Sequence, residues 1–155
     1  MEFGPWHKWR LRLYLHLIAI KRRITLGARV MMIDGDRIYL IRHTYLPGWH
    51  MPGGGVEPGE AAAASGAREV MEESGYRLTG PLQLFGLYHN TLTTSRDHVA
   101  LYISRQFEQA NVFKANLEIA EFGWFAHDAL PPETSASTLR RVAEVFDGAP
   151  RSENW

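Results

Sequence analysis

The chain has 155 residues, and its 17 Lys and Arg residues balance its 17 Asp and Glu residues. This length fits one compact domain, and a hydrophobic content of 45% exceeds that of a disordered chain. A net charge of zero argues against a non-specific nucleic-acid coat and against long RNA as a partner. The absence of cysteine excludes disulfides, cysteine-ligated metal sites and a thiol nucleophile. It is compatible with the cytoplasm, where we expect the protein to act.

Residues 1–25 are predicted to form an amphipathic helical extension. Apolar and aromatic residues recur at helical spacing from Trp6 to Ile20, with basic residues beside that stripe. We expect this helix to pack on the domain or on a second copy of the chain in a homodimer. The alternative for a basic, Trp-bearing helix is a membrane surface. No apolar run reaches the roughly 18 residues of a spanning helix, and the basic run at 21–23 argues against a cleaved signal peptide.

Residues 26–155 are predicted to form the main domain, which begins with a β-hairpin. Two short apolar runs, 30–33 and 38–41, flank an Asp-Gly turn at 34–36. The prolines and glycines of 45–60 then predict a loop.

Helices and further strands follow this loop. A helix is predicted over 60–74, and Gly75 is a suitable residue for its C-terminal cap. The remaining predicted elements are three strands and a final helix, at 82–88, 98–107, 121–125 and 135–146. Residues 99, 101 and 103 fall on one face of the middle strand, and residues 100 and 102 fall on the other. Because strands and helices mix without a regular βαβ repeat, we predict an α/β/α sandwich with a mixed sheet.

The helix over 60–74 carries three glutamates on one face. Glu69, Glu72 and Glu73 stand at positions i, i+3 and i+4. Like charges at this spacing cost roughly 0.2–0.5 kcal/mol per pair, and Arg68 offsets part of the repulsion by pairing with Glu72. A divalent cation would remove the conflict, because Mg²⁺ binds hard oxygen ligands. The alternative is a solvated acidic face that binds nothing.

A glycine-rich loop precedes this acidic helix. The glycines at 53–55 leave the backbone open to close approach by a metal or a phosphate. Pro58 and Gly59 turn the chain into the helix, so we expect the loop to lie against the glutamates. Gly66 costs roughly 1 kcal/mol relative to Ala inside a helix, and we therefore predict a close helix–sheet contact there.

The segment 54–76 resembles the signature of the Nudix hydrolases, G-x5-E-x7-R-E-U-x-E-E-x-G-U, where U is a bulky apolar residue. The matching residues are Gly54, Glu60, Arg68, Glu69, Val70, Glu72, Glu73, Gly75 and Tyr76. The flanking pattern extends the likeness to about 26–146. The resemblance implies a Nudix-like α/β/α sandwich and a metal-dependent hydrolase. Such enzymes cleave a pyrophosphate bond in a nucleoside diphosphate linked to another group, such as ADP-ribose, a nucleotide sugar or a (d)NTP.

The resemblance also implies roles for individual residues. Its metal and catalytic ligands correspond to Glu69, Glu72 and Glu73, one of which also acts as a general base. The carbonyl of Gly53 corresponds to a backbone metal ligand, and Arg68 to the residue that orients the carboxylates. Glu60 would reach the metals and substrate through water. The implied cofactor is Mg²⁺, with Mn²⁺ substituting, and the implied partner is a small nucleotide substrate.

Residues outside the motif are candidates for substrate binding. Tyr45 or Trp49 would stack on a base, and Arg42 would meet phosphate. Their alternative roles are core packing and a solvent-facing strand end. Of two acids that precede Trp124, Glu121 is preferred over Glu118 as an additional acid near the metals.

Two other functions stay open at the level of sequence. A Nudix-like module that senses a nucleotide without cleaving it would use the same fold. The second alternative is a pyrophosphohydrolase acting on RNA 5′ ends.

Overall fold

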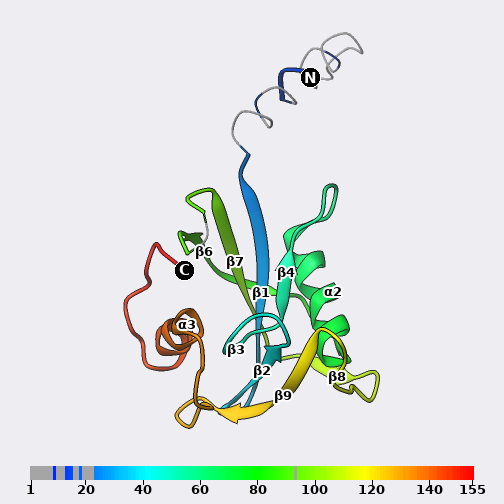
Figure 1. Cartoon of the computed structure of the whole chain (residues 1–155), viewed down its shortest axis with the longest axis vertical. Helices are drawn as coiled ribbons and strands as arrows, with labels where there is room; N and C mark the ends of the chain where they lie inside the picture. Colours follow the sequence, from blue (N-terminus) through cyan, green and yellow to red (C-terminus); the bar gives the residue numbers. More distant parts are fainter. Residues whose placement is uncertain (1–8, 10–12, 16–17, 19–22, 93) are drawn as a thin grey trace.

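The computed structural model describes residues 9, 13–15, 18, 23–92 and 94–155 (Figure 1). The helical extension predicted over 1–25 therefore lies largely outside the described residues, and its separation from a 26–155 domain stays a prediction. Among the described helices, none is long and apolar enough to cross a membrane.

The predicted hairpin is confirmed. Strands β1 (Thr25–Asp34) and β2 (Arg37–His43) pair antiparallel across a turn at Gly35, where φ is +64°. The other elements, in chain order, are β3 (Trp49–His50), β4 (Gly53–Gly55), α2 (Ala62–Ser74), β5 (Tyr76–Leu78), β6 (Gln83–Asn90), β7 (Asp97–Ser104), β8 (Phe107–Gln109), β9 (Ile119–Ala126) and α3 (Ala136–Phe146).

Seven strands form one mixed sheet, as predicted. The main path runs β3-β2-β1-β7-β6, while β4 pairs with β1 and β9 pairs with β2. β1 and β7 run parallel over eight residue pairs, and the other pairings are antiparallel. β5 and β8 form a separate two-stranded ribbon.

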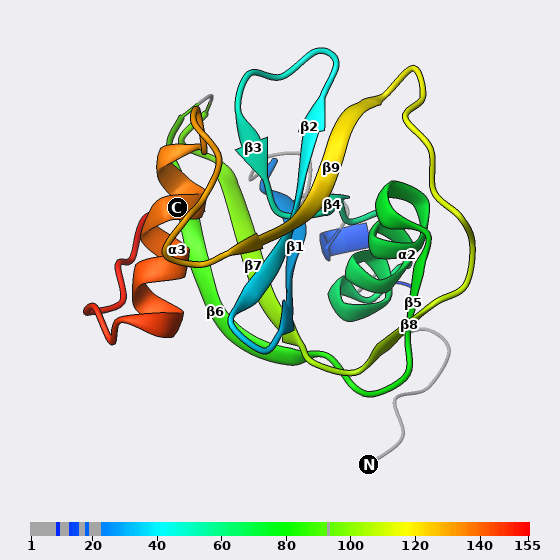
Figure 2. The same cartoon turned by 90° about the horizontal axis from the view of Figure 1, so that it is seen from below.

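The sheet lies between helices α2 and α3 (Figure 2). Leu101 and Ile103 of β7 enter the core that contains Val142 of α3. Ala100 and Tyr102 enter the opposite core, which contains Val70 of α2. This alternation confirms the two faces predicted for 99–103, because successive strand side chains point to opposite sides.

Three predicted boundaries were wrong. The loop predicted at 45–60 contains β3 and β4, whose backbones pair with β2 and β1. Helix α2 begins at Ala62 rather than at residue 60, because Ala61 has an extended backbone and the N–H of Glu60 bonds back to the carbonyl of Glu57. Phe107 belongs to β8 and pairs with Leu78, because β7 ends at Ser104.

Gly66 sets how closely α2 approaches the sheet. A Cβ atom at this position would lie 2.9 Å from Cγ2 of Val30 and 3.3 Å from Cδ1 of Leu82. The close helix–sheet contact predicted at Gly66 is therefore confirmed. Helix α2 thus packs on β1, whose first half also carries β4.

Candidate active site

Strand β4 carries the glycine loop along the edge of β1 and against the acidic helix. Gly53 pairs with Arg29, and Gly54 pairs with Ala28. A Cβ atom on Gly54 would lie 2.5 Å from Oε1 of Glu69. A side chain at Gly54 would displace the Glu69 carboxylate from the position that it holds beside the loop. The contact between loop and helix that the sequence predicts is therefore present.

Glu73 is held deepest in the site. It is 5% exposed, and its Oε2 accepts a 2.8 Å hydrogen bond from the backbone N–H of Gly53. The pKa of Glu73 is raised to about 7, chiefly by burial and to a smaller extent by the charges of Glu69 and Glu118. The Gly53 hydrogen bond and the charge of Arg29 act in the opposite direction. Burial has the largest effect because it disfavours the ionised form.

Arg68 links the loop to three carboxylates. Its Nε donates to Glu60 at 2.9 Å, and its Nη1 donates to Glu69 at 2.8 Å. Nη1 also lies 3.3 Å from Oε2 of Glu72, which confirms the predicted pairing over four residues. The hydrogen bonds from Arg68 lower the pKa of Glu60, and those to Glu60 and Glu69 raise the pKa of Arg68. Arg68 therefore fixes carboxylate orientation in this state of the site.

Two residues of the site come from strands, and the sequence reasoning assigned neither of them a role. Arg29 of β1 donates from Nη1 to the carbonyl of Met51 at 3.0 Å. Burial lowers the pKa of Arg29, and the charges of Glu73 and Glu69 act in the opposite direction. Nε2 of His43 lies 3.7 Å from Oε1 of Glu73. Burial lowers the pKa of His43 to about 4, so its imidazole is neutral at neutral pH. The sequence does place Arg29 as a lone cation beside an apolar run. Because a buried charge requires a partner, this pattern could have predicted that Arg29 faces an acidic group.

The donor set suits a hard divalent cation. Glu69, Glu72 and Glu73 offer carboxylate oxygens, which are the ligands that Mg²⁺ prefers, and Gly54 leaves the space beside Glu69 free of side-chain atoms. Within the described part of the chain, no three acidic or histidine side chains already converge as metal ligands do. Arg68 holds oxygens of Glu69 and Glu72 instead. A bound cation would therefore compete with Arg68 for the same carboxylates.

Of the substrate residues predicted outside the motif, Arg42 lies in β2, Tyr45 follows that strand, Trp49 lies in β3 and Glu121 lies in β9. Arg42 bonds to Glu121 at 3.2 Å across the β2–β9 pair. Tyr45 is 68% exposed, and its ring lies 5.0 Å from that of His43. Trp49 is instead 8% exposed and packs edge-on against Phe125 at 5.0 Å. Trp49 therefore packs in the core, which was the alternative to stacking on a base.

Solved structures share this fold. A MutT NUDIX hydrolase from Burkholderia pseudomallei superposes with a TM-score of 0.69 at 24% sequence identity, covering 79% of this chain and 98% of its own. An ADP-ribose pyrophosphatase from Streptococcus suis 89-1591 superposes with a TM-score of 0.62 at 23% identity, covering 84% of this chain and 95% of its own. At these identities the likeness shows the fold alone.

Sequence comparison identifies the family. A Bacillus subtilis (strain 168) protein, provisionally named as an 8-oxo-dGTP diphosphatase, is 26% identical over 126 residues, which are 81% of this chain and 82% of the relative. The NUDIX domain model matches residues 23–146 and so includes the glycine loop, the acidic helix and the strands that carry Arg29 and His43. The chain therefore belongs to the Nudix family and is a hydrolase that acts on pyrophosphate bonds.

Proposed function

We propose that the protein hydrolyses a pyrophosphate bond in a small nucleotide, a nucleoside diphosphate linked to another group, with Mg²⁺ as cofactor. The observation that carries the proposal is the contact between Gly54 and Glu69, because it sets a side-chain-free backbone beside a carboxylate. The names of relatives support a small nucleotide, since they refer to 8-oxo-dGTP and to ADP-ribose.

Glu69, Glu72, Glu73 and the Gly53 carbonyl would hold Mg²⁺, with Mn²⁺ able to substitute. When bound, the cation supplies positive charge that offsets the negative charge of the pyrophosphate and of the transition state. The side chains are graded in exposure, from buried Glu73 to Glu72, whose side chain is 57% exposed. Glu72 is therefore the ligand that solvent and substrate reach most easily.

The chain's own residues account for proton transfer and orientation. A carboxylate of the acidic turn takes the proton of the attacking water, the water oxygen bonds to phosphorus, and the bridging P–O bond breaks. Arg68 orients Glu69 and Glu72 before the cation binds. Arg29 adds a fixed positive charge beside Glu73, where an anionic substrate must approach. Arg42 with its partner Glu121, together with exposed Tyr45, is proposed to contact the outer part of the substrate.

The test is a substrate panel with defined metals. Purified protein would be incubated with ADP-ribose, a nucleotide sugar, 8-oxo-dGTP, the standard (d)NTPs and a 5′-triphosphate RNA, each with Mg²⁺, Mn²⁺ or EDTA. We expect turnover of a small nucleotide that requires the cation, and a loss of kcat of about 100-fold or more in Glu72→Gln. Glu108→Gln is the matched control, since Glu108 is an exposed acid paired with Arg77 on the β5–β8 ribbon.

Three outcomes separate the candidate functions. Cation-dependent turnover that falls in Glu72→Gln and not in Glu108→Gln supports the proposal. Tight nucleotide binding in calorimetry without product on chromatography would identify a sensor. Turnover confined to the RNA would identify a 5′-end hydrolase.

A further inference from the structure

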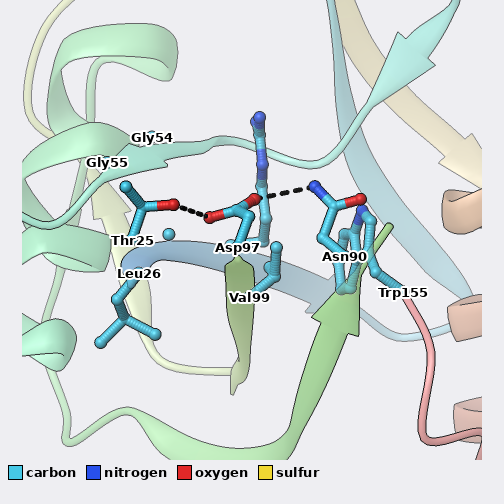
Figure 3. Close-up of a pocket in the computed structure, with 10 residues that line it drawn as sticks. Thr25, Leu26, Gly54, Gly55, Asn90, Asp97, Val99 and Trp155 are labelled. Atoms are coloured by element: carbon cyan, nitrogen blue, oxygen red, sulfur yellow. Dashed lines mark hydrogen bonds between the residues drawn. The ribbon is translucent and has the colours of Figure 1, made fainter. Parts of the chain in front are cut away.

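A cavity of about 230 Å³ opens beside the glycine loop and is not part of the acidic turn. Its walls come from β4, from the start of β1, from β6 and β7, and from Trp155 at the far end of the sequence (Figure 3). Ligand sites for drug-sized molecules start at roughly 300 Å³. The cavity therefore suits a single ring system rather than a whole dinucleotide.

Asp97 stands at the centre of the polar lining. Its Oδ1 accepts a 2.7 Å hydrogen bond from Thr25, and its Oδ2 accepts a 2.8 Å hydrogen bond from Asn90 (Figure 3). An ionised carboxylate offers about four acceptor positions, so two of them stay available to a ligand. The two neighbours hold the side chain of Asp97 in place as a preorganised acceptor. A ligand group that carries N–H donors meets this requirement.

Trp155 supplies the aromatic wall, and the fold fixes its place. Its backbone N–H donates to the carbonyl of His89 at 2.9 Å, and its ring packs edge-on against Tyr88 at 5.6 Å. Figure 3 shows Trp155 beside Asn90, on the opposite side of Asp97 from Gly54. The indole is partly buried and lines the cavity, and the Arg141 guanidinium lies over its ring at 5.5 Å from the ring centre. A planar ligand in the cavity would therefore meet the part of the indole that these neighbours leave uncovered.

A buried ion pair anchors the segment that carries Trp155. Arg141 is fully buried, and its Nη2 donates to Glu144 at 2.7 Å. Nη1 of Arg141 holds the carbonyl of Asn154 at 3.0 Å, and Glu144 accepts a 2.9 Å hydrogen bond from the backbone N–H of Ser152. The guanidinium also lies 3.9 Å from the centre of the Tyr88 ring. Helix α3 thus holds residues 152–155 in place beside the cavity.

The opposite end of the cavity leads toward the acidic turn. Arg29 and Gly54 both line the cavity, Arg29 interacts electrostatically with Glu73 and Glu69, and Gly54 faces Glu69. An anionic group would lie at this end, and an uncharged planar group would lie between Asp97 and Trp155. This polarity matches a nucleotide, which has an anionic end and a planar end.

We propose that this cavity binds the nucleobase of the substrate, with the base stacked on Trp155 and an amino-bearing edge directed at Asp97. The orientation of the nucleotide in this proposal rests on the proposed hydrolysis, because the phosphates must reach the acidic turn. It makes Trp155 and Asp97 specificity-determining residues for a base that carries an exocyclic amino group.

The test measures binding of nucleoside monophosphates, which contain no pyrophosphate bond. The probes are two pairs that differ in one amino group, GMP with IMP and AMP with purine riboside 5′-monophosphate, and ribose 5-phosphate as the probe without a base. The full chain would be labelled with ¹⁵N, and the indole N–H resonance of Trp155, assigned with Trp155→Phe, would be followed during each titration.

We expect GMP or AMP to shift the Trp155 resonance and to bind at least about tenfold more tightly than ribose 5-phosphate. Trp155→Leu should weaken this binding by about tenfold, as expected for the loss of one base–aromatic stack, while Trp155→Phe retains most of it. Trp124→Leu is the matched control, because Trp124 packs in the core on the other face of the sheet. Asp97→Asn should abolish the preference for the amino-bearing member of each pair.

The proposal is overturned if no monophosphate moves the Trp155 resonance, or if folded Trp155→Leu binds them as wild type does. If Trp155→Leu fails to fold, the wild-type resonance and the Asp97→Asn preference decide instead. Failure of the proposed hydrolysis has a different signature. In that case monophosphates bind in a Trp155-dependent manner, but no nucleotide is turned over with Mg²⁺.

Discussion

The backbone N–H of Gly53 donates a 2.8 Å hydrogen bond to Oε2 of Glu73, and this bond joins the glycine loop to the acidic helix of the Nudix motif. Gly53 has a φ of +147°, and a Cβ atom there would lie 2.1 Å from the carbonyl oxygen of Ala28. The bond therefore depends on a backbone position that only glycine occupies without strain. The glutamate that it holds is almost completely buried, which gives the site its unusual titration.

Gly54→Ala is expected to lower activity more than stability. The new methyl group would displace the Glu69 carboxylate, whose Oε1 would lie 2.5 Å away, and misplaced metal ligands or their supports cost about 10- to 100-fold in activity. The measurements are kcat with saturating Mg²⁺ and the free energy of unfolding in urea. Gly123→Ala is the control, because its Cβ would make only an ordinary 3.5 Å contact with Phe125. Equal activity of the two variants would contradict this account of Gly54.

The metal-free protein is expected to show a pH-dependent stability contribution from Glu73. The folded-state pKa is about 7, against 4.5 for the free side chain, so the folded state keeps a proton that the unfolded state loses. The contribution is full below pH about 4.5 and disappears as the pH rises to about 7. Its upper size is about 3 kcal/mol, since one pKa unit corresponds to about 1.4 kcal/mol.

His43 changes the stability with pH in the opposite direction, so a variant is needed to isolate the contribution of Glu73. The folded-state pKa of His43 is about 4, against 6.5 when free, and its contribution is lost as the pH falls through that range. Urea unfolding of wild type and Glu73→Gln in EDTA retains the His43 contribution in both proteins. The wild-type advantage should shrink between pH 4.5 and 7. A difference independent of pH would show that Glu73 titrates normally.

Gly66→Ala is expected to destabilise the protein in spite of its better helix propensity. The change gains roughly 1 kcal/mol in propensity, but the methyl group would lie 2.9 Å from Cγ2 of Val30 in the core. Overpacking of this kind costs about 1–3 kcal/mol, so we expect a net loss of up to about 2 kcal/mol in urea unfolding. Ala64→Gly is the control, because Ala64 is exposed on α2 and its change in unfolding free energy reports helix propensity alone. A net gain in Gly66→Ala would mean that the helix shifts away from β1 freely.

Glu118 and Glu121 are expected to differ in their effect on the metal requirement. The charge of Glu118 raises the pKa of Glu73, whereas Glu121 bonds to Arg42 at 3.2 Å. Glu118→Gln should raise the Mg²⁺ concentration for half-maximal activity by about tenfold. Glu121→Gln should leave that concentration within about twofold and change the KM for the nucleotide. The reverse pattern would restore Glu121 as the acid nearest the metals.

Elements with a strong side-chain period were predicted well from the sequence. The hairpin, the acidic helix and α3 each carry a local pattern that fixes which side is buried. β3 and β4 carry no such pattern, because strands of two and three residues are defined by backbone pairing with β2 and β1. Trp49 shows the same limit, since a loop aromatic and a core aromatic look alike until the sheet encloses one of them.

By itself the sequence determined that Glu69, Glu72 and Glu73 share one helical face and that a glycine loop precedes them. This spacing follows from 3.6 residues per turn and needs no distant partner. Only the tertiary structure decided that Arg29 and His43 stand beside Glu73, and that Trp155 borders the cavity next to Gly54. These neighbours come from strands and a chain end far apart in sequence, and burial between them sets the pKa of Glu73, because desolvation depends on every element that excludes water.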